Sequence, residues 1–225
     1  MKKLMHPSGL LAIGAMAFGV LLSAQAPGGG GQGKGGPGGP GGPGGGGRGG
    51  PRGPALTVTS SAFPDGGEIP MHFAGARGGD SKSPAFEFHW MNGTTAATAP
   101  DTLKSYAIVF HDIENSTAKG TVDTLHWSAF NIPGDAKGVA EGLGAGVLPD
   151  GTTNGPGIRG GAQGTYFGPG AGPGPFHHYV FEFYALDTKL ELTGTATRDE
   201  LMKAMEGHVI GKAAYVGRFH APPAQ

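Results

Sequence analysis

Short apolar segments recur along this chain from residue 55 onward, and they constrain its fold more than any other feature. Gly, Pro, Asn and Asp bound each segment and favour turns there, so the segments are typical of β-strands. They are LTVTS (56–60), FEFHW (86–90), SYAIVFHD (105–112), LHWSAFNIP (125–133), HHYVFEFYALD (177–187) and AAYVGRF (213–219). The continuous apolar run within 105–112 predicts a strand that is covered on both faces.

One helix is indicated late in the chain. Thr197 and Glu200 have the spacing of a capping box, in which each residue bonds the backbone of the other at a helix start. Apolar residues that share one helical face follow: Leu201, Ala204 and Met205. Gly207 then ends the helix. The sequence therefore predicts a mostly β fold, an antiparallel β-sandwich with one late α-helix.

The pattern of residues 1–26 is typical of an export signal. Lys2 and Lys3 precede an apolar stretch at 9–22, which is too short and too rich in glycine for a membrane span. Small residues at 23–26 provide a cleavage region, although Pro27 is a poor residue next to a cut. We expect a signal peptide at 1–26, and an uncleaved N-terminal anchor is the alternative.

A second segment, 27–54, is nearly all Gly and Pro and predicts a disordered tether, because its collagen-like period breaks down within a few residues. We expect one globular domain at 55–225. The protein is then exported, periplasmic or extracellular, with no integral membrane domain after signal cleavage.

Charge is divided unevenly between these parts. Residues 1–54 carry +5 and no acidic residue, whereas the remainder has 11 Lys and Arg against 17 Asp and Glu, a charge of −6. An acidic domain repels a phosphate backbone, which argues against nucleic-acid binding. The chain has no Cys, so disulfides, thiolate metal sites, a Cys nucleophile and lipid attachment to an N-terminal Cys are all excluded.

Histidines near strand ends are the candidates for chemistry. Asp112 ends one predicted strand and His126 begins the next, so an antiparallel hairpin would place both at one sheet edge. His177 begins another strand, after a loop rich in Gly and Pro at 164–176 whose backbone can approach a ligand closely. A carboxylate that holds an imidazole N–H raises the pKa of the ring, and the protonated ring attracts a small anion.

Other interpretations of these residues remain open. They can be polar side chains that are hydrogen-bonded locally at strand ends, and His89 and His111 are expected to be structural. His178 points away from His177 by strand alternation. Asp112, His126 and His177 are also permissible ligands for zinc or copper, although no metal-binding motif supports them. Serine hydrolase and phosphate-loop motifs are absent from the sequence.

Several motifs also follow one another in a set order. They are DGGEIP (65–70), Ser83-Pro84, Trp90, SYAIVFHD, His126-Trp127 with NIP, Tyr166-x-Gly168-Pro169, HHYVFEFYALD and AAYVGRF. This order resembles the phosphatidylethanolamine-binding protein family, in particular its bacterial branch of Raf kinase inhibitor-like proteins. The resemblance covers residues 55–219. It implies an antiparallel β-sandwich with a helix near the C-terminus.

The resemblance also implies a small pocket for phosphate-like anions, including phospholipid head groups. The residues that match the pocket of the family are Asp112, His126, Gly170, His177 and Tyr179. The sequence departs from the family beside the pocket, where D-P-D-A-P is replaced by residues 112–116 and the usual Arg of H-R-Y is His178. Glu114 stands in place of the second Asp.

Two functions follow as expectations. The first is a non-catalytic binding module for a small anionic ligand, a phospholipid head group or a protein partner, with no metal or other cofactor. The second is a metal-dependent or His-assisted hydrolase or lyase that uses the same residues. Inhibition of a cytoplasmic kinase does not carry over, because an exported domain does not meet one.

Overall fold

The computed structural model describes residues 53–75, 78–116, 120–157 and 164–223. The described elements all lie within one compact unit, which extends from Gly47 to Gln225. The signal peptide predicted at 1–26 lies outside the described residues, as does nearly all of the tether predicted at 27–54. In the described part of the chain, no helix is long and apolar enough to cross a bilayer.

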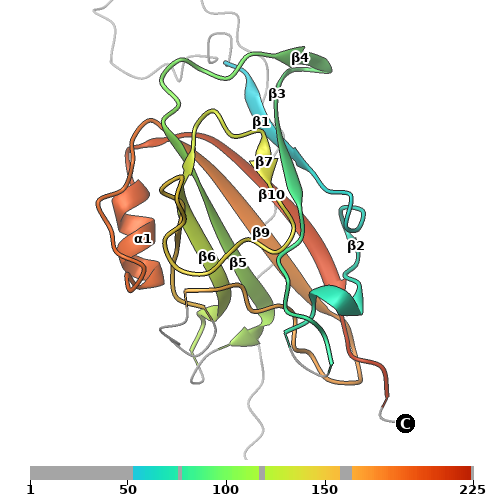
Figure 1. Cartoon of the computed structure of the whole chain (residues 1–225). Helices are drawn as coiled ribbons and strands as arrows, with labels where there is room; N and C mark the ends of the chain where they lie inside the picture. The colour runs from blue at the N-terminus through green and yellow to red at the C-terminus, as the bar shows by residue number, and fades with distance from the viewer. Residues whose placement is uncertain (1–52, 76–77, 117–119, 158–163, 224–225) are drawn as a thin grey trace, which may run out of the picture. The chain divides into compact units, whose positions relative to one another are not determined.

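Strands in two sheets form most of the regular secondary structure (Figure 1). The large sheet has the order β2 (Gly67–Glu68), β10 (Val209–Phe219), β9 (His177–Leu186), β5 (Ser105–Ser116), β6 (Asp123–Pro133) and β8 (Thr153–Asn154). The small sheet contains β1 (Ala55–Thr59), β3 (Phe86–Asn92), β4 (Thr95–Ala97) and β7 (Gly138–Val139). The pairs are antiparallel except for β2 with β10, which are parallel. The prediction of a mostly β antiparallel fold is confirmed.

Side chains of β5 alternate between two cores. Tyr106, Ile108 and Phe110 belong to the larger core, which also contains the inward residues of the small sheet. Ala107 and Val109 face the opposite side of the sheet, within a second core that includes α1 (Arg198–Met205). The predicted burial of this strand on both faces is therefore observed, because one face meets a sheet and the other meets the helix.

Aromatic rings dominate the larger core. Phe86 of the small sheet meets Phe181 and Phe183 of β9 at centroid separations of 4.9 Å each. Phe110 stacks on Phe181 with an interplanar angle of 11°. These contacts tie the two sheets together and explain why the aromatic segments at 86–90 and 177–187 form central strands.

The helix α1 begins as its sequence predicts. The Thr197 side chain accepts a hydrogen bond from the Glu200 backbone N–H, and the Glu200 carboxylate accepts one from the backbone N–H of Thr197. Leu201 and Met205 are buried against the outer face of the large sheet. An ion pair between Arg198 and Asp123 of β6 joins the start of the helix to the sheet.

The register of β5 and β9 determines which residues meet at one end of the large sheet. Asp112 is the partner of Tyr179, and the next residues along each strand lead to Glu114 and His177. This is the lower end of the large sheet in Figure 1, where the loop before β9 also passes. Residues from three separate parts of the chain therefore converge there.

Candidate functional site

Asp112 is a carboxylate inside the protein, with a relative exposure of 2%. Its Oδ1 accepts hydrogen bonds from the backbone N–H groups of Glu114 and Asn115, both at 3.1 Å. The Nδ1 of His177 donates to Oδ2 at 2.8 Å and approaches Oδ1 at 3.1 Å. Asp112 therefore holds the ring of His177, whose side chain remains one-third exposed.

His126 has a different set of partners. It lies on β6, is 2% exposed, and directs its Nδ1 at the carbonyl oxygens of Gly168 (3.0 Å) and Phe167 (3.2 Å). Carbonyl oxygens only accept, so Nδ1 carries a proton and Nε2 holds the lone pair of the neutral ring. Burial lowers the pKa of His126 and outweighs the opposing effects of the two carbonyls and of Asp112. The ring is therefore neutral near pH 7.

The predicted role of an Asp-held imidazole thus applies to His177 and not to His126. His126 packs between aromatic rings instead, with its centroid 5.4 Å from Phe110 and 5.3 Å from Tyr179. A buried neutral imidazole offers Nε2 as a hydrogen-bond acceptor or as a ligand atom for a metal. It does not supply the positive charge that the sequence-based argument required.

Tyr179 connects the strand to the loop rich in glycine. Its hydroxyl oxygen accepts hydrogen bonds from the backbone N–H groups of Gly170 (3.3 Å) and Ala171 (3.2 Å). Burial and the negative charge of Asp112 raise the pKa of the Tyr179 hydroxyl, so it stays protonated. The N–H of Gly170, which was predicted to contact a ligand, is engaged by the Tyr179 hydroxyl.

The loop is held in place from behind by the segment around the 3-10 helix η1 (Met71–Phe73). Tyr166 donates its hydroxyl proton to the carbonyl of Phe73 at 3.2 Å, and Gly75 N–H donates to Pro169 at 3.0 Å. A Cβ on Gly168 would lie 1.8 Å from the Phe73 carbonyl oxygen, so only glycine allows this approach. The carbonyls that bind His126 are therefore fixed in position.

Glu114 and His178 form a second carboxylate–imidazole pair beside the first. The Glu114 carboxylate accepts from the His178 backbone N–H at 2.6 Å and lies 2.7 Å from the His178 Nδ1. Burial alone would raise the pKa of Glu114, but these bonds from His178 lower it. The pair is exposed, in contrast to Asp112.

Three side chains at this end of the sheet could hold a metal ion together. Asp112, Glu114 and His177 each offer one ligand atom, and these atoms all lie within 4.8 Å of one another. The sequence-based metal alternative used His126 in place of Glu114. Glu114 was not predicted from the sequence as part of a metal-binding set, because the orientation of its side chain depends on His178 of the neighbouring strand β9.

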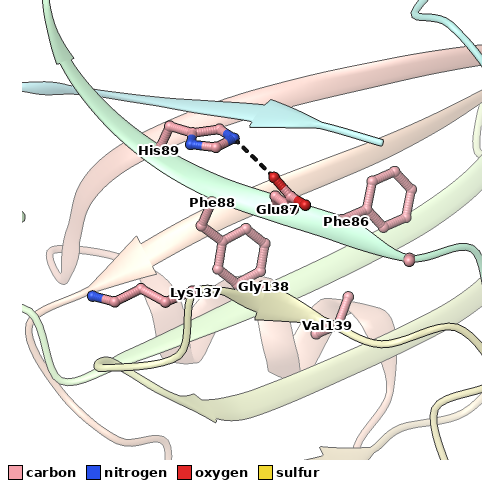
Figure 2. A pocket seen from close by; sticks show the side chains of 8 residues that line it. Phe86, Glu87, Phe88, His89, Lys137, Gly138 and Val139 are labelled. Atoms are coloured by element: carbon pink, nitrogen blue, oxygen red, sulfur yellow. Dashed lines mark ion pairs between the residues drawn. The ribbon is translucent and has the colours of Figure 1, made fainter. Parts of the chain in front are cut away.

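The remaining histidines of interest lie elsewhere. His111 faces the side of the sheet that α1 covers, and its Nδ1 lies 2.5 Å from Asp123 Oδ2. His89 lies on β3 beside a shallow hollow of about 460 Å³ on the small sheet, where its Nε2 is 3.7 Å from Glu87 (Figure 2). Lys137 lines the same hollow. None of the site residues predicted from the sequence lines it.

Comparison with known proteins agrees with the fold. The profile of the family described as phosphatidylethanolamine-binding protein matches residues 59–220, which is most of the chain. The chain belongs to the phosphatidylethanolamine-binding protein family. The resemblance inferred from the order of the motifs is therefore confirmed, together with the fold that it implied.

Proteins similar to this chain come from several organisms. A UPF0098 protein of Methanothermobacter thermautotrophicus is 34% identical over 165 residues, covering 73% of this chain and 98% of the relative. LppC of Mycobacterium tuberculosis, named as a lipoprotein, is 32% identical over 73% of this chain and 72% of its own. The crystal structure of CT736, a phosphatidylethanolamine-binding protein homologue of Chlamydia trachomatis, aligns with a TM-score of 0.61 and 25% identity, over 75% of this chain and 99% of the other.

Glu114 and His178 are two of the positions singled out from the sequence as departures from the family pattern, and they bond each other. The two changes therefore form one local feature at the rim of the site. A sequence comparison could flag each position separately, but only the hydrogen bonds between them in the structure show that they form a pair.

Proposed function

We propose that this protein is an exported, non-catalytic member of the phosphatidylethanolamine-binding protein family that binds a small ligand with a phosphoryl or other anionic group. A phospholipid head group is one source of such a ligand. The convergence of Asp112, His126, His177 and Tyr179 beside the loop 166–171 supports the proposal. A protein partner is the alternative occupant.

The cluster suits binding more than turnover. Each polar side chain has a partner that fixes its direction: Asp112 holds His177, two carbonyls hold His126, and two loop N–H groups hold Tyr179. Rigid groups of this kind preorganise a site and reduce the entropy lost when a ligand binds. The exposed ring of His177 is the part of the cluster that solvent reaches most easily.

Titration calorimetry with phosphoethanolamine tests this proposal. We expect His177→Ala to weaken binding by about tenfold or more, because a hydrogen bond to a charged group contributes about 1.5–3 kcal/mol, and Asp112→Asn to weaken it as well, because Asp112 orients the His177 ring. His208→Ala is a matched control. The Nδ1 of His208 lies 2.8 Å from Asp187 Oδ1, so the two residues form a similar pair, and this pair lies away from the site. Equal affinity in all three variants, or no binding to the wild type, would contradict the proposal.

Export is supported by the signal-like residues 1–26 and by the similarity to LppC, a protein named as a lipoprotein. We expect a chain without residues 1–26 to remain in the cytoplasm of a bacterial host, while the full chain is found outside it. Fractionation with an antibody to the β-domain measures both. Retention of the full chain in the cytoplasm would contradict export.

A further inference from the structure

The cluster around Asp112 is unusually negative for a site that receives an anion. Asp112 and Glu114 both present carboxylates, and among the described residues neither forms an ion pair with Lys or Arg. Their partners are imidazoles, and the nearby His126 is neutral. Within the described part of the chain, a phosphoryl group that enters this end of the sheet therefore meets two carboxylates that no Lys or Arg neutralises.

A bound cation would remove this conflict, and the ligand set for one is present. Asp112, Glu114 and His177 offer two oxygens and one nitrogen, all within 4.8 Å of one another. Zinc binds such atoms at roughly 2.0–2.2 Å, so ligand atoms around one ion lie about 3–4 Å apart. The separation of the three ligand atoms is therefore close to that found around a single ion, and an ion would take the place of the hydrogen bond between His177 and Asp112.

The chemistry of the ligands selects the kind of cation. An imidazole nitrogen favours zinc and similar transition metals, whereas magnesium prefers oxygen atoms and keeps several waters. Three protein ligands leave a fourth position open for an outside oxygen, as in zinc sites that bind substrates. Glu114 and the ring of His177 are accessible from solvent, so an ion can reach the cluster.

We propose that Asp112, Glu114 and His177 bind one zinc-like divalent cation, and that its open coordination position receives an oxygen of the anionic ligand. The second part rests on the proposed function of the site, while the cation site itself does not. Glu114 has the decisive role, because without it the cluster keeps only one carboxylate and one imidazole. His178 acts as a positioning residue that holds the Glu114 carboxylate.

Calorimetric titration of the full chain with ZnCl₂ and, separately, with MgCl₂ tests the cation site. We expect about one zinc per chain, bound about 100-fold more tightly than magnesium. Glu114→Gln and His177→Ala should each weaken zinc binding by about tenfold or more, with His208→Ala unchanged. Because Glu114 is exposed, Glu114→Gln should keep the fold, which thermal unfolding of the metal-free variant verifies.

Phosphoethanolamine affinity, measured with and without zinc, tests the coupling. We expect binding to be about tenfold tighter with zinc in the wild type and equal under both conditions in Glu114→Gln. Zinc affinity that is unaffected by Glu114→Gln and His177→Ala would overturn the cation site. Site-specific zinc binding with no phosphoethanolamine binding would support the cation site and contradict the proposed function. If the affinity for phosphoethanolamine is the same with and without zinc, the coupling between the two ligands is overturned and the cation site is not.

Discussion

His126 lies between the large sheet and the loop that precedes β9, and its surroundings determine both its tautomer and its charge. The carbonyls of Phe167 and Gly168 accept from Nδ1, while burial lowers the pKa of the ring. The groups that face it are Asp112 of β5, Tyr179 of β9 and these loop carbonyls. A histidine buried in its neutral form makes the fold sensitive to acid.

The sign of this effect follows from linkage. An exposed histidine in the unfolded chain has a pKa near about 6.5, above that of His126 in the fold, so the unfolded chain binds the proton first as the pH falls. We expect the free energy of unfolding of the wild type, relative to His126→Gln, to fall from about pH 7.5 to about pH 5. Urea unfolding at several pH values measures the difference. An equal pH dependence in both proteins would show that His126 is not held neutral.

A second prediction at the scale of single residues concerns Gly168. A Cβ there would lie 1.8 Å from the Phe73 carbonyl oxygen, and backbone atoms cannot yield as a side chain can. We expect Gly168→Ala to lower the free energy of unfolding by about 1–3 kcal/mol, through overpacking. Gly53→Ala is the control, because no atom lies within 4 Å of the added methyl group. Equal stability of the two variants in urea would refute the close packing of the loop.

The elements were recognisable from local patterns where those patterns were long enough. The six predicted strand segments correspond to β1, β3, β5, β6, β9 and β10, and the capping box marks the start of α1. The strands that local patterns missed are β2, β4, β7 and β8, which have two or three residues each. Such short strands show no periodicity, and only their pairing with a longer strand defines them.

The helix cap gives a prediction at the scale of the element. We expect Thr197→Ala to destabilise the protein by about 1 kcal/mol, because it leaves an N–H at the start of α1 without its acceptor. Lys203→Ala should have a smaller effect, since the ion pair of Lys203 with Glu206 is exposed to solvent. Thermal unfolding compares the two. A larger loss in Lys203→Ala would contradict the capping argument.

At the scale of the whole molecule, the two hydrophobic cores consist of described residues from Leu56 onward. Residues 1–54 carry a charge opposite in sign to that of the remainder. A chain that begins at Ala55 therefore retains every strand of both sheets. We interpret residues 55–225 as an independent folding unit.

Deleting residues 1–54 tests that interpretation. We expect one cooperative thermal transition with a midpoint within about 2 °C of that of the longer chain. A change of about 1 kcal/mol in the free energy of unfolding shifts the midpoint of a domain of this size by about 2–4 °C, and we expect a smaller change than that. Scanning calorimetry measures the midpoint. Loss of cooperativity, or a large drop in the midpoint, would mean that the first residues take part in the fold.

Local alternation and capping by themselves determined where the long strands and the helix lie, because both are set by residues close together in sequence. The order of motifs also indicated the family, which the family profile confirms, and it suggested the residues of the candidate site, which stay a prediction. Only the tertiary structure decided which groups bond each other. Asp112 bonds His177 and not His126. Tyr179 accepts a hydrogen bond from the N–H of Gly170, and Glu114 bonds His178. The physical reason is that these contacts depend on strand register and on the path of a loop braced by η1, which local patterns do not encode.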